Sequence, residues 1–170
     1  MKKYDVLKLE KLTKLIIQCI NDNTLRPLLM IRDNDLVIVT VIKKLKEIKK
    51  DNLIKFLNFA KKENINLNFT MEYGWTILMK ICTLYKFDLD NSILKLLIKL
   101  GVKLNLKNSS DGYTALMLVV INGDIKKTKI LIEAGADVNI KTFNGNTALD
   151  YAKRNNNNEL IELLKSNGAK

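Results

Sequence analysis

The sequence predicts an all-α fold in which pairs of helices stack into a solenoid. Two observations carry this prediction: segments of the chain repeat at a fixed offset, and each repeat alternates turn residues with apolar runs of helical period. The segment Asp111–Phe143 aligns with Asn144–Lys170 at an offset of 33 residues without a gap. One such unit cannot bury its apolar face alone, so neighbouring units are expected to share a continuous core.

The repeats divide the chain into five predicted parts of one solenoid domain. Residues 1–39 form a helical N-terminal cap, and 40–72 form a degenerate repeat. Residues 73–110 form a repeat with extra residues around Phe87–Asn91. Residues 111–143 form the best-preserved repeat, and 144–170 form a C-terminal capping repeat. Terminal units with a polar outer face are what a solenoid needs at its ends.

Within the repeat at 111–143, each element follows from local chemistry. Gly112 can adopt positive φ in a turn, and Thr114 is a good N-cap for the first helix. Asn122-Gly123-Asp124 ends that helix, and a second helix is predicted from about Ile125 to Glu133. Gly135 ends the second helix, after which the chain runs on toward the next turn.

The first 40 residues do not repeat. Apolar residues at helical spacing predict an amphipathic helix over about Asp5–Ile20, and Pro27 suits the first turn of a short helix ending near Arg32. The run Leu36–Ile42 has strand propensity, but the phase of the repeat favours a helix there.

The repeated phrases resemble the ankyrin repeat over about Thr40–Lys170. The matching residues are the Gly-x-Thr-x-Leu openings at Gly74, Gly112 and Gly145, and the phrase GADVN at Gly135–Asn139. The proline and histidine of the family's Thr-Pro-Leu-His phrase are missing from every copy. The resemblance implies turns that project as fingers, first helices that line a concave groove, and a groove that binds proteins.

Composition limits the other functions. Apolar residues make up 47% of the chain, yet no uninterrupted apolar stretch suits a membrane helix or a secretory signal, so we expect a cytoplasmic protein without membrane contact. Cys19 and Cys82 form no CxxC motif, and histidine is absent. The chain has no glycine-rich phosphate loop and no carboxylates at metal-site spacing. We therefore expect no enzyme, no cofactor and no metal.

The net charge of +11 leaves nucleic acid or another polyanion as an alternative partner. Only Arg26, Arg32 and Arg154 are arginines among the 29 basic residues, whereas nucleic-acid readers favour arginine. The densest basic run is Lys43–Lys50. Further lysines are expected on a solvated face away from the groove: Lys95, Lys99, Lys103, Lys126, Lys127 and Lys129.

The leading interpretation is a protein-binding module, monomeric alone, that acts through its fingers and groove, for instance as an inhibitor or immunity-type protein. Aromatic residues on exposed turns have no core to fill and are enriched at interface centres. The alternative is that they hold neighbouring fingers together, and the sequence argument places Trp75 and Tyr113 ahead of Tyr73 and Phe143 as interface residues. The predicted partner-binding residues are Glu72, Tyr73, Trp75, Leu84, Asp111, Tyr113, Ile121, Asn122, Phe143 and Arg154.

Overall fold

The computed structural model describes residues 6–22, 24–25, 40–41, 48–84 and 91–170, and the statements below concern these residues. The chain divides into two compact units, Met1–Phe69 and Thr70–Lys170. Every predicted partner-binding residue falls in the second unit.

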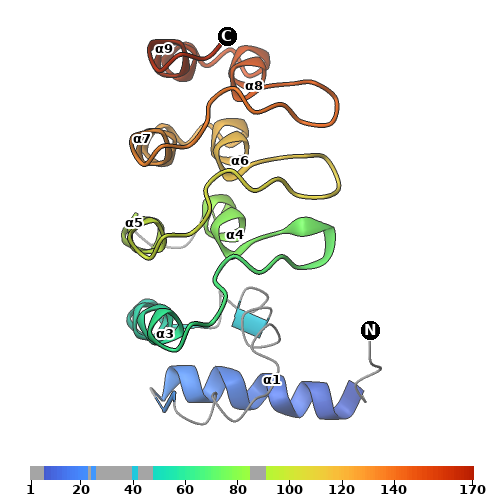
Figure 1. Cartoon of the computed structure of the whole chain (residues 1–170), viewed down its shortest axis with the longest axis vertical. Coiled ribbons are helices and arrows are strands. Elements are labelled where there is room, and N and C mark those ends of the chain that lie inside the picture. The colour runs from blue at the N-terminus through green and yellow to red at the C-terminus, as the bar shows by residue number, and fades with distance from the viewer. Residues whose placement is uncertain (1–5, 23, 26–39, 42–47, 85–90) are drawn as a thin grey trace. The chain divides into compact units, whose positions relative to one another are not determined.

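The first unit contains helix α1, Val6–Asn21, and helix α3, Lys50–Lys62, which contact each other (Figure 1). Ile16 and Ile20 of α1 are buried one turn apart. The Nδ2 of Asn52 donates to the carbonyl oxygen of Asn21 at 2.7 Å. The buried residues of α3 follow the same helical spacing: Leu53, Phe56, Leu57 and Ala60.

The amphipathic helix predicted at Asp5–Ile20 is therefore confirmed as α1, within a residue at each end. Two other N-terminal predictions lie wholly or mostly outside the described residues: the short helix ending near Arg32, and the run Leu36–Ile42. Of that run only Thr40 and Val41 are described, and both are helical.

The second unit is built of three helix pairs. The first pair is α4, Ile77–Thr83, with α5, Ser92–Lys99. The second is α6, Ala115–Ile121, with α7, Ile125–Glu133. The third is α8, Ala148–Arg154, with α9, Asn158–Ser166. Figure 1 shows α4, α6 and α8 in one layer and α5, α7 and α9 in a second, with the connecting turns projecting past the first layer.

In each helix pair of the second unit, a threonine is the N-cap of the first helix. The Oγ1 atoms of Thr76, Thr114 and Thr147 accept hydrogen bonds from the backbone N–H three residues later. Each bond satisfies one of the amides left without a partner at a helix start. At Thr147 the cap is reciprocal, because the carboxylate of Asp150 accepts from the N–H of Thr147. The Gly-x-Thr-x-Leu phrase thus marks a turn followed by a capped helix.

The core lies between the layers. Helices of seven residues are too short to be stable alone, so packing must hold them. Helix α6 contacts α4, α7 and α8, and six consecutive residues from Ala115 to Val120 are buried. The all-α prediction of an ankyrin-type solenoid is confirmed in fold class. Among the described helices, none has both the length and the apolar character that crossing a membrane requires.

Candidate functional site: the finger face

Three turns precede the first helices, and each is closed by a backbone hydrogen bond. The N–H of Met71 donates to the carbonyl of Trp75 at 2.8 Å, that of Asn108 to Tyr113 at 2.9 Å, and that of Thr142 to Asn146 at 2.8 Å. We call these turns the first, second and third fingers: Met71–Trp75, Asn108–Tyr113 and Thr142–Asn146. Together with Lys80, Leu84, Lys107, Ile121, Asn122, Tyr151 and Arg154 they make up the finger face.

Positive φ angles shape the fingers. Gly74, Gly112 and Gly145 have φ values of +70°, +78° and +80°. In the first finger Tyr73 also has a positive φ, +61°, which is unfavourable for a bulky L-residue. The corresponding Asp111 and Asn144 have no positive φ, so the first finger alone of the three carries this strain.

Consecutive fingers are joined through the backbone. The N–H of Ser109 donates to the carbonyl of Tyr73 at 2.8 Å, and that of Phe143 donates to Asp111 at 3.0 Å. A Cβ added to Gly74 would lie 2.6 Å from the nitrogen of Ser109, and one added to Gly112 would lie 2.8 Å from that of Phe143. These glycines therefore allow the next finger to approach closely as well as the turn to form.

The four aromatic residues of the fingers differ in exposure. Tyr73 is 68% exposed and Phe143 is 60% exposed, whereas Trp75 and Tyr113 are half-buried. A lysine ammonium lies 4.7 Å from the ring centre in two cases, Lys80 over Trp75 and Lys107 over Phe143. Solvent exposure thus ranks Tyr73 and Phe143 above Trp75 and Tyr113, the reverse of the order that the sequence suggests.

Tyr113 packs against Tyr151 of α8. Their ring centres are 5.6 Å apart with the planes inclined at 58°, and their hydroxyl oxygens are 3.4 Å apart. The hydrogen bond that Tyr113 shares with Tyr151, with partial burial, raises the pKa of Tyr113 to about 12. Arg154 completes this cluster: its guanidinium lies 5.4 Å from the Tyr151 ring centre, and its Nη2 donates to Asn146 Oδ1 at 2.8 Å.

The two predicted apolar groove residues, Leu84 and Ile121, are half-buried at the C-terminal ends of α4 and α6. Their carbonyl oxygens accept bonds from the following repeat: Leu84 from Lys127 Nζ at 3.4 Å, and Ile121 from Asn155 Nδ2 at 3.0 Å. Asn122, the C-cap of α6, is half-buried as well. These bonds satisfy carbonyl groups that a helix end leaves without partners.

The prediction for one lysine, Lys127, is wrong. It was expected on the solvated lysine face, but its side chain is only 11% exposed and its ammonium lies 3.2 Å from Asp124 Oδ2. The other five lysines of that group are exposed. Most of Lys43–Lys50 and of the insertion Phe87–Asn91 lies outside the described residues.

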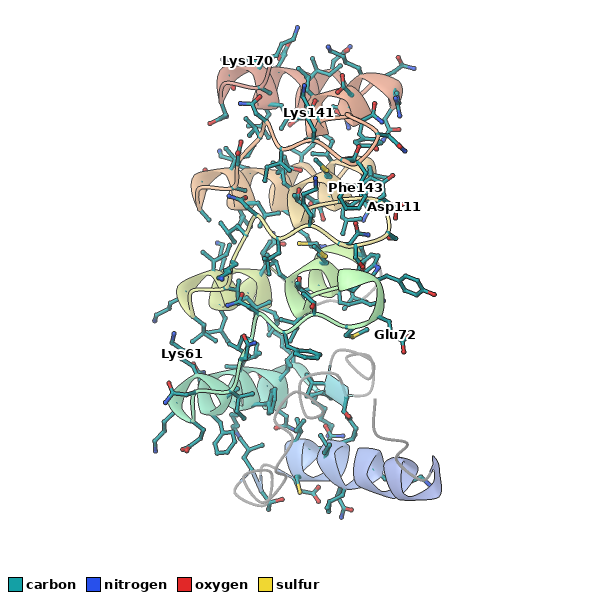
Figure 2. The ribbon with its side chains drawn as sticks, turned by 45° about the vertical axis from the view of Figure 1, so that its right-hand side comes forward. Lys61, Glu72, Asp111, Lys141, Phe143 and Lys170 are labelled. Carbon is teal, nitrogen blue, oxygen red and sulfur yellow. The ribbon has the colours of Figure 1, made fainter. Side chains whose placement is uncertain are left out.

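The remaining predicted residues, Glu72 and Asp111, are exposed acidic groups on the first and second fingers. Figure 2 shows Glu72, Asp111 and Phe143 along the same side of this unit. In the part of the chain that the structure describes, no three cysteine, aspartate or glutamate side chains gather closely enough to hold a metal ion. The finger face is therefore a surface of aromatic and charged side chains.

The profile of the family described as "Ankyrin repeats (3 copies)" matches residues 10–141 and 85–170. The chain belongs to the ankyrin-repeat family. An ankyrin repeat protein of Acanthamoeba polyphaga mimivirus is 30% identical over 120 residues, which are 71% of this chain and 15% of that protein.

Relatives from other sources match shorter stretches. An ankyrin repeat protein of fowlpox virus is 43% identical over 61 residues, 36% of this chain and 12% of its own length. The nuclear factor NF-kappa-B p105 subunit of Gallus gallus is 38% identical over 79 residues, 46% of this chain and 8% of that subunit. The chain thus spans less than a sixth of these relatives, so the likeness concerns the ankyrin repeats and not the activities of whole proteins.

Asparagine side chains form hydrogen bonds between consecutive ankyrin repeats. The N–H of Asp137 donates to Asn105 Oδ1 at 3.0 Å. One repeat later, Asn139 donates from Nδ2 to the carbonyl of Gly168 and accepts on Oδ1 from the N–H of Lys170, each at 3.0 Å. The final asparagine of the GADVN phrase therefore bonds the backbone of the next repeat.

Sequence reasoning missed four contributors to the finger face: Lys80, Lys107, Asn146 and Tyr151. Tyr151 could have been found, because it aligns with Leu118 at the 33-residue offset and replaces an apolar residue with an aromatic hydroxyl. The others carry no local signal, because they matter through the ring or guanidinium that each one contacts.

Proposed function

We propose that this protein is a non-enzymatic module that holds a partner protein against its finger face. Ankyrin repeats are generally protein–protein interaction modules. The observation that carries the proposal is the exposure of Tyr73 and Phe143 on the first and third fingers. They are the exposed large hydrophobic residues among the described side chains of the second unit, and such aromatic residues are typical interface anchors.

The backbone of Tyr73 supports the same proposal. A tyrosine at φ +61° costs stability, and a side chain that is two-thirds exposed buries little area in return. Asparagine or glycine would suit this turn position better. Burial of the Tyr73 ring by a partner would give this tyrosine a role that it does not have in the folded chain alone.

A module of this kind acts by covering a surface of its partner. Inhibition by occlusion, of which an immunity-type protein is one case, is compatible with the proposed binding mode. The acidic Glu72 and Asp111 beside the exposed rings would select partners with a basic rim around an apolar patch.

The test is affinity capture from a nuclease-treated lysate of the cells that produce the protein. The wild type is compared with a Tyr73→Asn/Phe143→Ser variant and with a Lys95→Gln/Lys126→Gln control, which removes exposed lysines outside the finger face. We expect the finger variant to lose a protein that both the wild type and the control retain. The captured protein is then purified and its affinity for each variant measured.

The opposite pattern supports the alternative of a polyanion on the exposed lysines. In that case the lysine variant loses binding, the finger variant retains it, and the affinity for a short DNA duplex falls steeply with salt, because counterions are released. Equal capture by all three proteins would contradict both assignments.

A further inference from the structure

Arg154, Tyr151, Tyr113 and Asn146 form a cluster on the finger face. It joins the third finger, helix α8 and the second finger through two hydrogen bonds between side chains, one ring pair and one cation–aromatic contact. All four residues lie in the second unit, and none is fully buried.

Arg154 is held in place although it is exposed. Asn146 takes one of its five N–H donors and the Tyr151 ring lies against the guanidinium, so most of its hydrogen-bonding capacity points to solvent. The neighbouring carboxylate of Asp150 accepts instead from the N–H and the hydroxyl of Thr147, each at 2.8 Å. Within the described residues no ion pair joins Arg154 to a carboxylate.

The tyrosines add a second donor. Two hydroxyl groups that share one hydrogen bond leave one O–H free, whichever of them donates. The O–H that remains at the Tyr113–Tyr151 pair is therefore a second hydrogen-bond donor in the cluster. A planar cation with parallel N–H donors and an adjacent O–H donor complements a carboxylate.

We infer that this cluster receives the carboxylate of an aspartate or glutamate side chain of the partner protein. The inference rests on the proposed function, and it specifies the partner further: an acidic side chain seated at Arg154, with apolar residues that reach the exposed rings of the fingers. Desolvation of the guanidinium by the partner strengthens the pair, because Arg154 is already positioned and loses little conformational freedom.

The experiment is selection of random short peptides displayed on phage against the whole immobilised chain. Three variants are screened in parallel: Arg154→Gln, Arg154→Lys, and Lys153→Gln, which removes the same charge from the adjacent exposed residue. We expect one enriched acidic position with the wild type and with Lys153→Gln. That position should lose its preference with Arg154→Gln and weaken with Arg154→Lys, which keeps the charge but not the planar fork.

A double-mutant cycle then measures the pair directly by fluorescence anisotropy. Replacing the enriched acid of a selected peptide by its amide should weaken binding to the wild type by about tenfold or more, and should have little effect on Arg154→Gln. An equal loss with both proteins, or selection without an acidic position, overturns the inference. Binding of a short single-stranded oligonucleotide that depends on Arg154, without an acidic peptide position, would overturn it in favour of phosphate.

Failure of the inference can be separated from failure of the proposed function. Peptides that depend on Tyr73 and Phe143 but not on Arg154 would leave the finger face as a protein-binding surface and remove only the carboxylate. Peptides that depend on none of these residues would contradict both.

Discussion

The backbone N–H of Phe143 donates to the carbonyl oxygen of Asp111 at 3.0 Å, which joins the tip of the third finger to that of the second. The bond requires close approach at Gly112, where the amide nitrogen of Phe143 occupies the space next to the α-carbon. One glycine therefore controls both the shape of its own finger and the position of an exposed aromatic residue in the next. The spacing of the fingers depends on such backbone hydrogen bonds between them.

Comparing substitutions at Gly112 and Gly145 should separate the effect of the positive φ from the effect of the close approach of the next finger. Gly112→Ala meets a positive φ and a backbone nitrogen at 2.8 Å, whereas the equivalent Gly145→Ala meets a similar φ with nothing within 4 Å. We expect Gly145→Ala to lower the free energy of unfolding by about 1 kcal/mol. Gly112→Ala should lower it by about 1–3 kcal/mol more, because the third finger must move.

Urea denaturation followed by circular dichroism measures both variants. Equal losses would contradict the close approach of the fingers, since the two positions share the φ requirement and differ in the neighbouring finger.

Tyr73→Asn should stabilise the protein while it weakens partner binding. Asparagine tolerates the left-handed region far better than tyrosine, and the lost ring buries little area. The free energy of unfolding should rise by about 1 kcal/mol. Phe143→Ser is the control, because Phe143 is exposed without a positive φ, and it should bring no such gain. A loss of stability with Tyr73→Asn would mean that the ring supports the first finger.

Asn108 holds the second finger from within. It is buried, and its Oδ1 accepts from the N–H of Tyr113 at 2.6 Å, while its Nδ2 donates to Ser110 Oγ. Asn108→Ala should lower the free energy of unfolding by about 1–3 kcal/mol, because the Tyr113 amide loses its acceptor. Ser110→Ala removes the exposed end of the same network and should cost far less. Thermal denaturation of the two variants at one protein concentration checks the order.

The capping box of α8 should make stability depend on pH in acid. Hydrogen bonds from the backbone and side chain of Thr147 lower the pKa of Asp150 below its usual value of 3.8. Because the folded-state pKa is lower than the unfolded one, the stabilisation is fully present well above pH 3.8 and is lost as the pH falls through the folded pKa.

Asp150→Asn therefore should be less stable than the wild type at neutral pH, and the difference should shrink as the pH falls below the unfolded pKa. Urea midpoints of both proteins at neutral and acidic pH measure it. A difference that stays constant with pH would show that the charge of Asp150 does not contribute.

The helices of the repeats could be predicted from the sequence because their signals are local. Thr114 lies at an N-cap as expected, and the second helix runs from Ile125 to Glu133, the bounds that the pattern indicates. Turn glycines, capping threonines and apolar spacing act over a few residues, so reading along the chain suffices.

Exposure of the site residues could not be predicted in the same way. Trp75 has Lys80 over its ring, and Tyr113 meets Tyr151, 38 residues away. The ammonium of Lys127 donates to the carbonyl oxygen of Leu84 in the preceding repeat. The contacts of Tyr113 and Lys127 depend on which residues the stack brings together across repeats, which a pattern along one repeat does not contain. The partner-binding assignments themselves stay predictions.

The two backbone hydrogen bonds between fingers have the same direction: the later finger supplies the N–H and the earlier finger supplies the carbonyl oxygen. The hydrogen bonds of Asn105 and Asn139 likewise link one repeat to the next. A duplicated repeat inserted in frame would therefore meet a matching donor or acceptor at each of its two borders. The finger face can thus lengthen by whole repeats during evolution without new hydrogen-bonding groups at the borders, and each added repeat brings one more fingertip for selection to vary.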